Sequence, residues 1–429
     1  MNVLLIGGGG REHALAWKIF QSPLLKKFYA IPGNPGIENF AECIENISAE
    51  NNSEIVKFAQ EKNIDLVVVG PEIPLVNGLV DELEKVGIKS FGCNKKAAQI
   101  EGSKIFAKNL MKKYKIPTAN FEVFDNLSDA KNYISSQKFP VVIKADGLAA
   151  GKGVIIAKNF DEALNALDEM KNFGDAGKKI VVEEFMDGEE ASVLAFTDGK
   201  IILPMIPAQD HKRIFDNDEG LNTGGMGAYA PAPVVNPDVM KKVQEKILNP
   251  IIAALNEEKI IYRGCLYAGL MIQNGEPKVV EFNCRFGDPE TQVVIPLLKS
   301  DLLEIMLACA EGNLSEKKIS WSKDFAICVI LASGGYPKSY KKNFPIDGIK
   351  KAESLGAKIF HAGTKVADSG QDTGDRKILT SGGRVLGVTV TEKNIQSAIE
   401  KVYKCVDVIN FENMHFRKDI ATKALKYFY

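Results

Sequence analysis

The sequence lacks closely paired cysteines, long apolar runs and an excess of charge of one sign. Its seven cysteines, at 43, 93, 265, 284, 309, 328 and 405, include no CxxC pair, which disfavours a disulfide framework and a cysteine zinc site. No apolar run approaches the roughly 20 residues that span a bilayer, and the N-terminus shows no basic leader. With 54 Lys and Arg against 55 Asp and Glu, the net charge of −1 gives no electrostatic reason to bind nucleic acid or an anionic membrane. We therefore expect a cytoplasmic globular protein that binds neither.

The length and the alternation of strands and helices indicate more than one domain. At 429 residues the chain corresponds to about three domains of ordinary size. In the first hundred residues, short apolar strands alternate with helical stretches, which is typical of a parallel sheet covered by helices on both faces. The strands are expected at 3–6, 66–69 and 88–91, and the helices at 11–20 and 75–86. We predict an N-terminal, Rossmann-like α/β domain over residues 1–102.

From about residue 103 the pattern changes to helices mixed with hairpins. Apolar strands at 141–144 and 154–157 flank a glycine-rich loop, and strands at 192–197 and 200–203 flank Asp198-Gly199, a dipeptide that favours a tight hairpin. Between them, Asp161 is expected to cap a helix that ends near Lys171. These patterns predict an α+β domain over 103–323, with a mobile lid at about 118–190. A small C-terminal α+β domain over 324–429 should contain strands at 325–331 and 384–390 and a helix at 394–406.

Two glycine-rich segments suggest nucleotide loops but match neither common motif. In GGGGREHA, at 7–14, a dinucleotide fingerprint would need glycine where Glu12 or His13 stands, so nicotinamide or flavin binding is disfavoured. Amides at a helix N-terminus next to Arg11 still favour an anion, and a simple tight turn is the equal alternative. The segment at 147–153 has too few residues between its glycines for a Walker A loop and lies between strands. With Lys144 on its incoming strand, it is interpreted as a lid over phosphates rather than a plain surface hairpin.

The most informative stretch is VVEFNCRFGDPE, at 279–290. Because side chains alternate along a strand, Glu281, Asn283 and Arg285 should share one face, and Val280, Phe282 and Cys284 the other. Carboxylate and amide oxygens suit Mg²⁺ that bridges nucleotide phosphates, and an arginine suits a carboxylate or a developing phosphate. A second acidic segment, VVEEFMDGEEAS at 181–192, could contact adenine and ribose, although acid-rich turns are often only solvated.

With these segments in order, the chain resembles the ATP-grasp superfamily and, within it, the phosphoribosylamine–glycine ligase family. The resemblance covers essentially the whole chain, and its most specific parts are QDHKRIFDNDEGLNTGGMGAYAP at 209–231 and EFNCRFGDPETQ at 281–292. The other matching strings are GGGGREHAL at 7–15, PGNPG at 32–36, GPE-x-PL at 70–75, EGSK at 101–104, KADGLAAGKGV at 144–154, SGGRVLGV at 381–388 and HFRKDIA at 415–421. The family implies that ATP, glycine and 5-phosphoribosylamine give glycinamide ribonucleotide, ADP and phosphate through glycyl phosphate, in purine biosynthesis. It implies a monomer that takes only these small-molecule partners.

The resemblance also implies roles for individual residues. Arg285 and Lys144 would be catalytic, and Glu281 and Asn283 would bind Mg²⁺ or Mn²⁺. The implied ATP-binding residues are Lys104, Lys144, Gly151, Lys152, Glu183, Glu184, Met186 and Glu190. The implied substrate-binding residues are Gly9, Gly10, Arg11, Asp210, Arg285, Asp288 and Arg384.

One departure and two absences refine this picture. Many ATP-grasp enzymes carry a further metal carboxylate on the strand before the Glu-x-Asn strand, whereas 267–271 contains no acid, which leaves the number of metals open. No Ser–His–Asp or Cys–His arrangement lies near these motifs, and neither His13 nor His211 is expected to act as a general base. The alternatives are another ATP-grasp ligase or carboxylase, a nucleotide-binding module without catalysis, and a Rossmann dehydrogenase.

Overall fold

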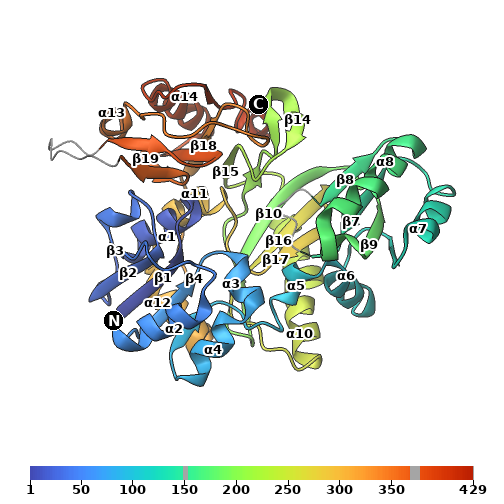
Figure 1. Cartoon of the computed structure of the whole chain (residues 1–429), viewed down its shortest axis with the longest axis horizontal. Helices are drawn as coiled ribbons and strands as arrows, with labels where there is room; N and C mark the ends of the chain where they lie inside the picture. Colours follow the sequence, from blue (N-terminus) through green and yellow to red (C-terminus); the bar gives the residue numbers. More distant parts are fainter. Residues whose placement is uncertain (148–152, 368–376, 429) are drawn as a thin grey trace.

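The computed structural model describes residues 1–147, 153–367 and 377–428, and nothing below concerns the remaining residues. In the described part of the chain, four larger sheets and two short hairpins form the framework. The N-terminal sheet and the sheet made of β6 (Phe121–Phe124), β7 (Val141–Ala145), β8 (Val154–Ala157) and β9 (Ile180–Glu184) lie at opposite ends of the molecule (Figure 1). Strands β10 (Glu189–Thr197), β16 (Gly264–Gln273) and β17 (Glu276–Asn283) lie between them. The predicted multidomain α/β and α+β fold is confirmed.

The N-terminal sheet is parallel throughout, with the order β3-β2-β1-β4-β5. Its strands are β1 (Asn2–Gly7), β2 (Lys27–Pro32), β3 (Glu42–Cys43), β4 (Leu66–Val69) and β5 (Lys89–Phe91). Both faces of β1 are buried, because Val3 and Leu5 pack in one apolar cluster and Leu4 and Ile6 in another. This arrangement is why the strand is a continuous apolar run rather than an alternating one.

Helices α1 (Gly10–Ile19), α2 (Asn52–Glu61), α3 (Glu72–Asn77) and α4 (Leu79–Lys85) connect these strands. The single helix predicted at 75–86 is wrong, because the chain forms two helices that meet at Gly78. Gly78 adopts a left-handed φ of 91°, which ends α3 and which a residue with a side chain rarely accepts. The helical periodicity continued through this glycine and hid the break.

The sheet at the far end is antiparallel, with the order β6-β9-β7-β8. Its elements are β6 (Phe121–Phe124), α7 (Leu127–Ile134), β7 (Val141–Ala145), β8 (Val154–Ala157), α8 (Phe160–Met170) and β9 (Ile180–Glu184). Its apolar core is separate from that of the rest of the chain. The predicted cap Asp161 is wrong: the Asn159 side chain accepts a hydrogen bond from the Glu162 amide and caps α8.

A second antiparallel sheet crosses the centre of the molecule in the order β11-β10-β16-β17. Its strands are β10 (Glu189–Thr197), β11 (Ile202–Pro204), β16 (Gly264–Gln273) and β17 (Glu276–Asn283). The remaining helices of this part are α5 (Gln99–Gly102), α6 (Lys104–Lys113), α9 (Pro237–Val243), α10 (Asn249–Glu257), α11 (Thr291–Val294) and α12 (Leu302–Glu311). The hairpin predicted around Asp198-Gly199 forms, with Gly199 at a φ of 88°.

The last sheet combines strands from two distant parts of the chain. Its members are β12 (Gln209–Asp210), β15 (Gly227–Ala230), β18 (Phe325–Ser333), β19 (Lys358–His361), β22 (Arg384–Glu392) and β23 (Met414–His415). The helices α13 (Ile349–Ser354) and α14 (Ile395–Val406) accompany it, as do the hairpins β13 (Arg213–Phe215) with β14 (Glu219–Asn222) and β20 (Thr364–Val366) with β21 (Ile378–Thr380). Because β12 and β15 precede residue 324, this sheet crosses the predicted domain boundary, which stays a prediction.

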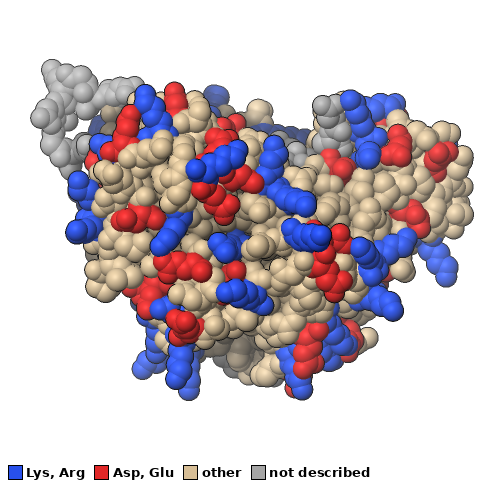
Figure 2. Space-filling view, turned by 90° about the horizontal axis from the view of Figure 1, so that it is seen from below, with Lys and Arg blue, Asp and Glu red and all other residues tan. Residues whose placement is uncertain are grey.

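The surface shows charges of both signs. On the face seen in Figure 2, lysine and arginine side chains are interspersed with aspartate and glutamate, as the near-zero net charge leads one to expect. Among the described residues, no helix has the length and apolar character required to cross a bilayer.

Candidate active site

A cleft of about 820 Å³ lies between the antiparallel sheets. Residues of the N-terminal and C-terminal parts of the chain also line it. Residues from β7, β8 and β9 line one part of it, and residues from β10, β16 and β17 line another. It gathers these residues proposed from the sequence: Arg11, Lys104, Lys144, Glu183, Glu184, Met186, Glu190, Asp210, Glu281, Asn283, Arg285, Asp288 and Arg384. Gly151 and Lys152 lie outside the described residues, and Gly9 and Gly10 do not line the cleft.

Strand β17 carries Glu281 and Asn283 to the cleft. Within the described chain, neither the Glu281 carboxylate nor the Asn283 amide has a hydrogen bond or ion pair with another protein group, so their oxygens are available to a ligand. Burial alone would raise the pKa of Glu281, but Lys212, Lys144 and Lys104 together outweigh burial and lower it. An ionised carboxylate beside an amide oxygen matches the hard oxygen ligands that Mg²⁺ and Mn²⁺ prefer.

The strict alternation predicted for this strand holds only in part. Phe282 and Cys284 are buried in the apolar core, at 2% and 1% exposure. Val280 nevertheless lines the cleft together with Glu281, and Phe282 also borders it, which the alternation did not predict. The reason is a register shift between β16 and β17, where Gly269 pairs with Glu281 and the next residue of β16 pairs with Val279.

A buried group of two lysines and one glutamate forms the inner wall of the cleft. One oxygen of Glu183 lies 2.9 Å from Lys108 Nζ and 3.0 Å from Lys144 Nζ, while its other oxygen is buried without a partner. Lys144 also donates to the carbonyl of Val280, at 3.3 Å. Burial lowers the pKa of Lys108 to about 8, against the opposing charge of Glu183. Sequence reasoning missed Lys108, although it follows Lys104 by one helical turn and shares its face of α6.

The acidic segment after β9 has mixed surroundings. Glu184 accepts hydrogen bonds from the backbone and side chain of Asn120, at 3.0 and 2.9 Å. Glu190, on β10, forms an ion pair with Lys212. These contacts hold two of the acids in place, and Met186 lines the cleft beside them.

A second acidic group lies deeper in the cleft, around Asp210. Burial and the charge of Glu290 raise the pKa of Asp210 well above its usual range, and its Oδ1 atom is buried without a hydrogen-bond partner. Glu290 accepts hydrogen bonds from Ser192 Oγ at 2.9 Å and from the Tyr267 hydroxyl at 3.0 Å. Sequence reasoning did not single out Glu290 or Tyr267 as site residues, because only the fold brings β10, β16 and the segment after β17 together.

In the glycine-rich turn before α1, polar groups that the sequence suggested were free for an anion already bond to Glu12. The Gly9 amide donates to Glu12 Oε2 at 2.8 Å, and Arg11 Nε lies 2.6 Å from the other oxygen of the same carboxylate. A side chain at Gly10 would lie 2.6 Å from Gln292 Nε2, so close packing is one reason for glycine there. Arg11 reaches the cleft and also donates to the carbonyl of Phe286, at 3.0 Å.

Arg384 and Asp288 close the end of the cleft that faces the C-terminal part. Arg384 Nη2 lies 3.3 Å from Asp288 Oδ2, and its Nη1 donates to the carbonyls of Gly224 and Asp288, at 2.6 and 2.8 Å. Burial raises the pKa of Asp288, but the charges of Arg384 and Arg11 outweigh it and lower the pKa. An arginine fixed in this way offers its remaining donors to an anion.

The β13–β14 hairpin also borders the cleft, and contacts with Arg417 hold it in place. Arg417, which is only 1% exposed, forms ion pairs with Asp218 at 2.8 Å and Asp419 at 2.6 Å. It also donates to the carbonyl of Arg213, at 3.1 Å. The string HFRKDIA at 415–421 therefore supports the hairpin that borders the cleft and does not line the cleft itself.

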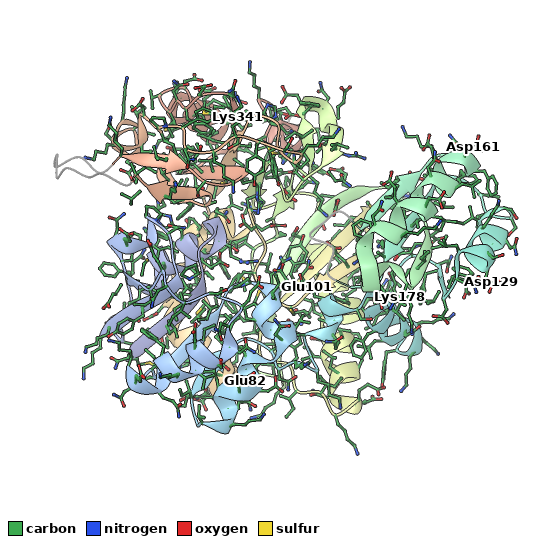
Figure 3. The ribbon with its side chains drawn as sticks, in the orientation of Figure 1. Glu82, Glu101, Asp129, Asp161, Lys178 and Lys341 are labelled. Carbon is green, nitrogen blue, oxygen red and sulfur yellow. The ribbon has the colours of Figure 1, made fainter. Side chains whose placement is uncertain are left out.

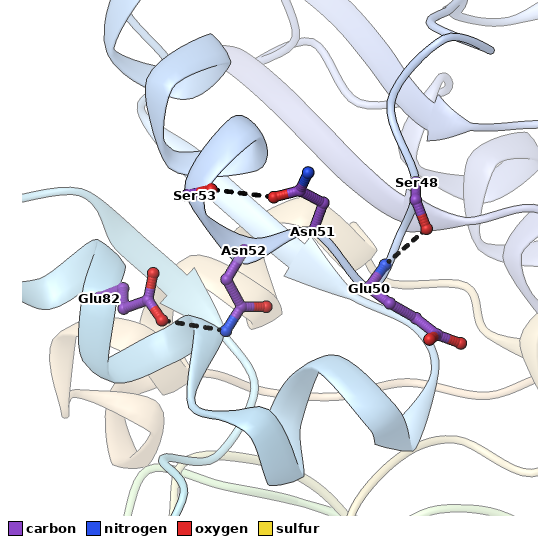
Figure 4. Close-up of a pocket in the computed structure, with 6 residues that line it drawn as sticks. All are labelled: Ser48, Glu50, Asn51, Asn52, Ser53 and Glu82. Carbon is purple, nitrogen blue, oxygen red and sulfur yellow. Dashed lines mark hydrogen bonds between the residues drawn. The ribbon is translucent and has the colours of Figure 1, made fainter.

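A smaller hollow lies at the start of α2 (Figure 4). Its polar groups bond to one another: the Asn52 amide donates to Glu82 at 3.1 Å, and the Ser53 hydroxyl to Asn51 at 2.9 Å. Asn51 also caps α2 by accepting from the Glu54 amide. These are the contacts of an ordinary helix start, and we assign no function to this hollow.

Comparison with known proteins places the fold in a class. Family models described as the N domain, the ATP-grasp (A) domain and the C domain of phosphoribosylglycinamide synthetase match residues 1–101, 102–291 and 326–423. A biotin carboxylase from Campylobacter jejuni, solved with a nucleotide, shares the fold with a TM-score of 0.70 over 97% of this chain and 93% of that one, at 16% identity. Together with the cleft, these matches define the chain as an ATP-dependent ligase of the ATP-grasp class.

Closer relatives define the family. The chain is 49% identical to the phosphoribosylamine–glycine ligase of Caldanaerobacter subterraneus, over 98% of this chain and 99% of that one. It is 47% identical to the enzyme of that name from Escherichia coli, over 99% of both chains. A crystal structure of the Thermotoga maritima phosphoribosylamine–glycine ligase matches with a TM-score of 0.85 and 32% identity, over 98% of this chain and 100% of that one. The chain belongs to the phosphoribosylamine–glycine ligase family.

Proposed function

We propose that this chain joins glycine to 5-phosphoribosylamine at the expense of ATP, giving glycinamide ribonucleotide, ADP and phosphate in purine biosynthesis. The family supports the choice of substrates, and the cleft supports the chemistry. The observation that carries the proposal is the grouping of Glu281, Asn283 and Arg285 with Lys104 and Lys144 around a single cleft. A cytoplasmic location and a monomeric state belong to the same proposal.

The inner wall of the cleft suits the nucleotide. The free oxygen of Glu183 can accept a hydrogen bond from the exocyclic amino group of adenine, and the two lysines on its other oxygen hold the carboxylate in place. Val142, Ile156 and Met111 add apolar surface to the same cleft. Lys104, whose ammonium group donates to the carbonyl of Gly147 at 2.8 Å, is placed to reach phosphates.

The reaction follows from positioning and charge neutralisation, which supply most of the rate in phosphoryl transfer. A glycine carboxylate oxygen attacks the γ-phosphorus, and the bond to the bridging oxygen of ADP breaks, which gives glycyl phosphate. The amine of phosphoribosylamine then attacks the acyl carbon, phosphate leaves, and the nitrogen loses a proton. Arg285 holds the carboxylate and then the acyl phosphate, while Lys144 balances charge on the phosphates. Glu281 and Asn283 would hold Mg²⁺ or Mn²⁺, which would neutralise phosphate charge.

The other end of the cleft suits the second substrate. Arg384 and Arg11 present positive charge near Asp288 and can receive the ribose 5-phosphate. Asp210, with one oxygen unpaired, is available to an amino group. We retain Gly9 and Gly10 only as backbone neighbours of this end, since the Gly9 amide is already bonded to Glu12.

The test is the substitution Arg285→Ala. We expect ligation, followed as phosphate release with ATP, glycine and phosphoribosylamine, to fall by at least about 100-fold, because an arginine that stabilises transferring charge contributes on the order of 10³. ATP affinity should stay near normal. Arg263→Ala, which removes an arginine that donates to the Ala310 carbonyl away from the cleft, is the matched control. Equal loss of ATP binding in Arg285→Ala would contradict the assigned role, and turnover without phosphoribosylamine would favour another ATP-grasp reaction.

A further inference from the structure

The carboxylate of Glu101 bridges two consecutive residues of the active-site segment. Its Oε2 atom accepts a hydrogen bond from the backbone amide of Cys284 at 2.7 Å, and its Oε1 atom accepts one from Arg285 Nη2 at 2.8 Å. The carboxylate therefore fixes both the main chain from which Arg285 starts and the guanidinium in which it ends. Figure 3 labels Glu101 near the centre of the molecule, between the N-terminal sheet and the sheet of β6 to β9.

These contacts lie in a buried setting, where an unpaired carboxylate is costly. The Glu101 side chain is 7% exposed and that of Arg285 is 18% exposed. Burial raises the pKa of Glu101, and the charge of Arg285 opposes this rise. Glu72, on α3, adds a longer contact of 3.3 Å to Arg285 Nε. The guanidinium is thus held from the side of the N-terminal part of the chain.

The segment that carries Glu101 is itself anchored. Ser103 caps α6, and its hydroxyl donates to Asp146 Oδ1 at 3.0 Å. The same Asp146 oxygen accepts from the Ile105 amide at 3.1 Å. Lys104 donates to the carbonyl of Gly147. The EGSK string therefore joins the end of β7 to the segment after β17 through several hydrogen bonds.

We propose that Glu101 is a positioning residue for Arg285, which it holds in one orientation at the cleft. This inference rests on the proposed role of Arg285 toward the substrate carboxylate. A free arginine side chain samples many rotamers, and a planar guanidinium is useful only when it is already aligned with its target. A displacement of about 1 Å of a catalytic group can cost on the order of 100-fold in rate.

The experiment compares Glu101→Gln, Glu101→Asp and Arg285→Ala with the unaltered protein. Glutamine keeps the shape but removes the charge and places an amide donor against the donors of Arg285 or Cys284. We expect kcat/KM for glycine to fall by about 10- to 100-fold, with the Kd of ATP changed by less than about twofold. Aspartate keeps the charge but is one methylene shorter, so it should restore part of the loss. Asp198→Asn, which alters a buried carboxylate away from the cleft, controls for lost stability alone.

The double variant Glu101→Gln with Arg285→Ala separates positioning from a general structural role. If Glu101 acts through Arg285, the double variant is as slow as Arg285→Ala alone. A further loss in the double variant, or an equal loss of ATP affinity in Glu101→Gln, would overturn the inference. If Glu101→Gln proves unstable, the same comparison is made with Glu101→Asp. Full activity of Arg285→Ala would instead refute the proposed role of Arg285, whereas normal kinetics of Glu101→Gln beside an inactive Arg285→Ala would refute the inference alone.

Discussion

Three buried histidines should make this protein sensitive to mild acid. His13, on α1, accepts a hydrogen bond at Nδ1 from the backbone amide of His361, at 2.7 Å, so protonation of that nitrogen would break the contact. Burial, reinforced by the neighbouring His361, lowers the pKa of His13 well below its usual value. Burial also lowers the pKa of His361 to about 4 and that of His211 to about 3. The rings of His361 and His211 are therefore neutral in the folded protein at pH 6, and burial favours the neutral form of His13 as well.

The direction of the effect depends on whether the folded or the unfolded chain binds more protons. The pKa of each histidine is about 6.5 in the unfolded chain and lower in the folded one, so the unfolded chain binds more protons below pH 6.5. The free energy of unfolding therefore decreases as the pH falls, and the slope approaches about 1.4 kcal/mol per pH unit for each neutral buried histidine once the pH is well below 6.5. Between pH 6.5 and 5.0 the loss is about 1.6 kcal/mol each for His361 and His211, and His13 adds to it in the same direction. Asp210, with its raised pKa, acts in the opposite direction.

Urea unfolding at several pH values between 7.5 and 5.0 measures this dependence. His13→Asn removes one titrating ring but leaves an amide oxygen that can accept from His361. The free energy of unfolding of the variant should decrease less steeply with falling pH than that of the unaltered protein, because one fewer histidine takes up a proton on unfolding. His415→Asn, at a partly exposed ring that contacts the Ile214 carbonyl, is the control. Parallel pH dependences for His13→Asn and the unaltered protein would refute the reasoning.

Two further substitutions test other buried charges. Lys108 has a pKa of about 8 in the folded chain and about 10.5 when unfolded, so stability should rise by about 3 kcal/mol from pH 8 to 10.5. Lys108→Met should reduce the rise measured by urea unfolding by about that amount, and a rise equal to that of the unaltered protein would contradict it. Arg417→Met leaves Asp218 with only a 4.0 Å contact to Lys423 and Asp419 with the amide of Asn217, so we expect a loss of about 2 kcal/mol and faster proteolysis within the β13–β14 hairpin. Unchanged proteolysis would show that the hairpin does not depend on Arg417.

The sequence predicted the features that depend on local pattern. The strand of 141–144 and the helix that begins at Lys104 lie close to where periodicity placed them. The cap of α8 was misplaced because Asn159 and Asp161 are both good capping residues, and only the structure shows which one meets a free amide. The shift in register opposite Gly269 leaves no mark on the alternation of side chains.

The site was predicted in part for the same reason. Residues at strand ends, such as Lys144 and Glu281, lie where the motifs indicated, and their individual roles remain predictions. The contacts that support them come from distant segments: Glu101 reaches Arg285 across 184 positions of the chain, and Ser192 reaches Glu290 across 98. A pattern within a few residues cannot encode such pairs, because they depend on how the sheets are placed relative to one another.

The six-stranded sheet limits how the chain can be divided. β15 pairs with β18 over four residues, so a fragment that begins near residue 324 would leave the backbone of Ala326 to Val329 without its neighbour along that edge. An unpaired apolar edge invites self-association, and the complementary fragment would lose the partner of Gly227 to Ala230. A split reporter should therefore not be divided at the apparent junction before β18. We expect a gene cut at that junction to yield two halves that self-associate unless both are produced together.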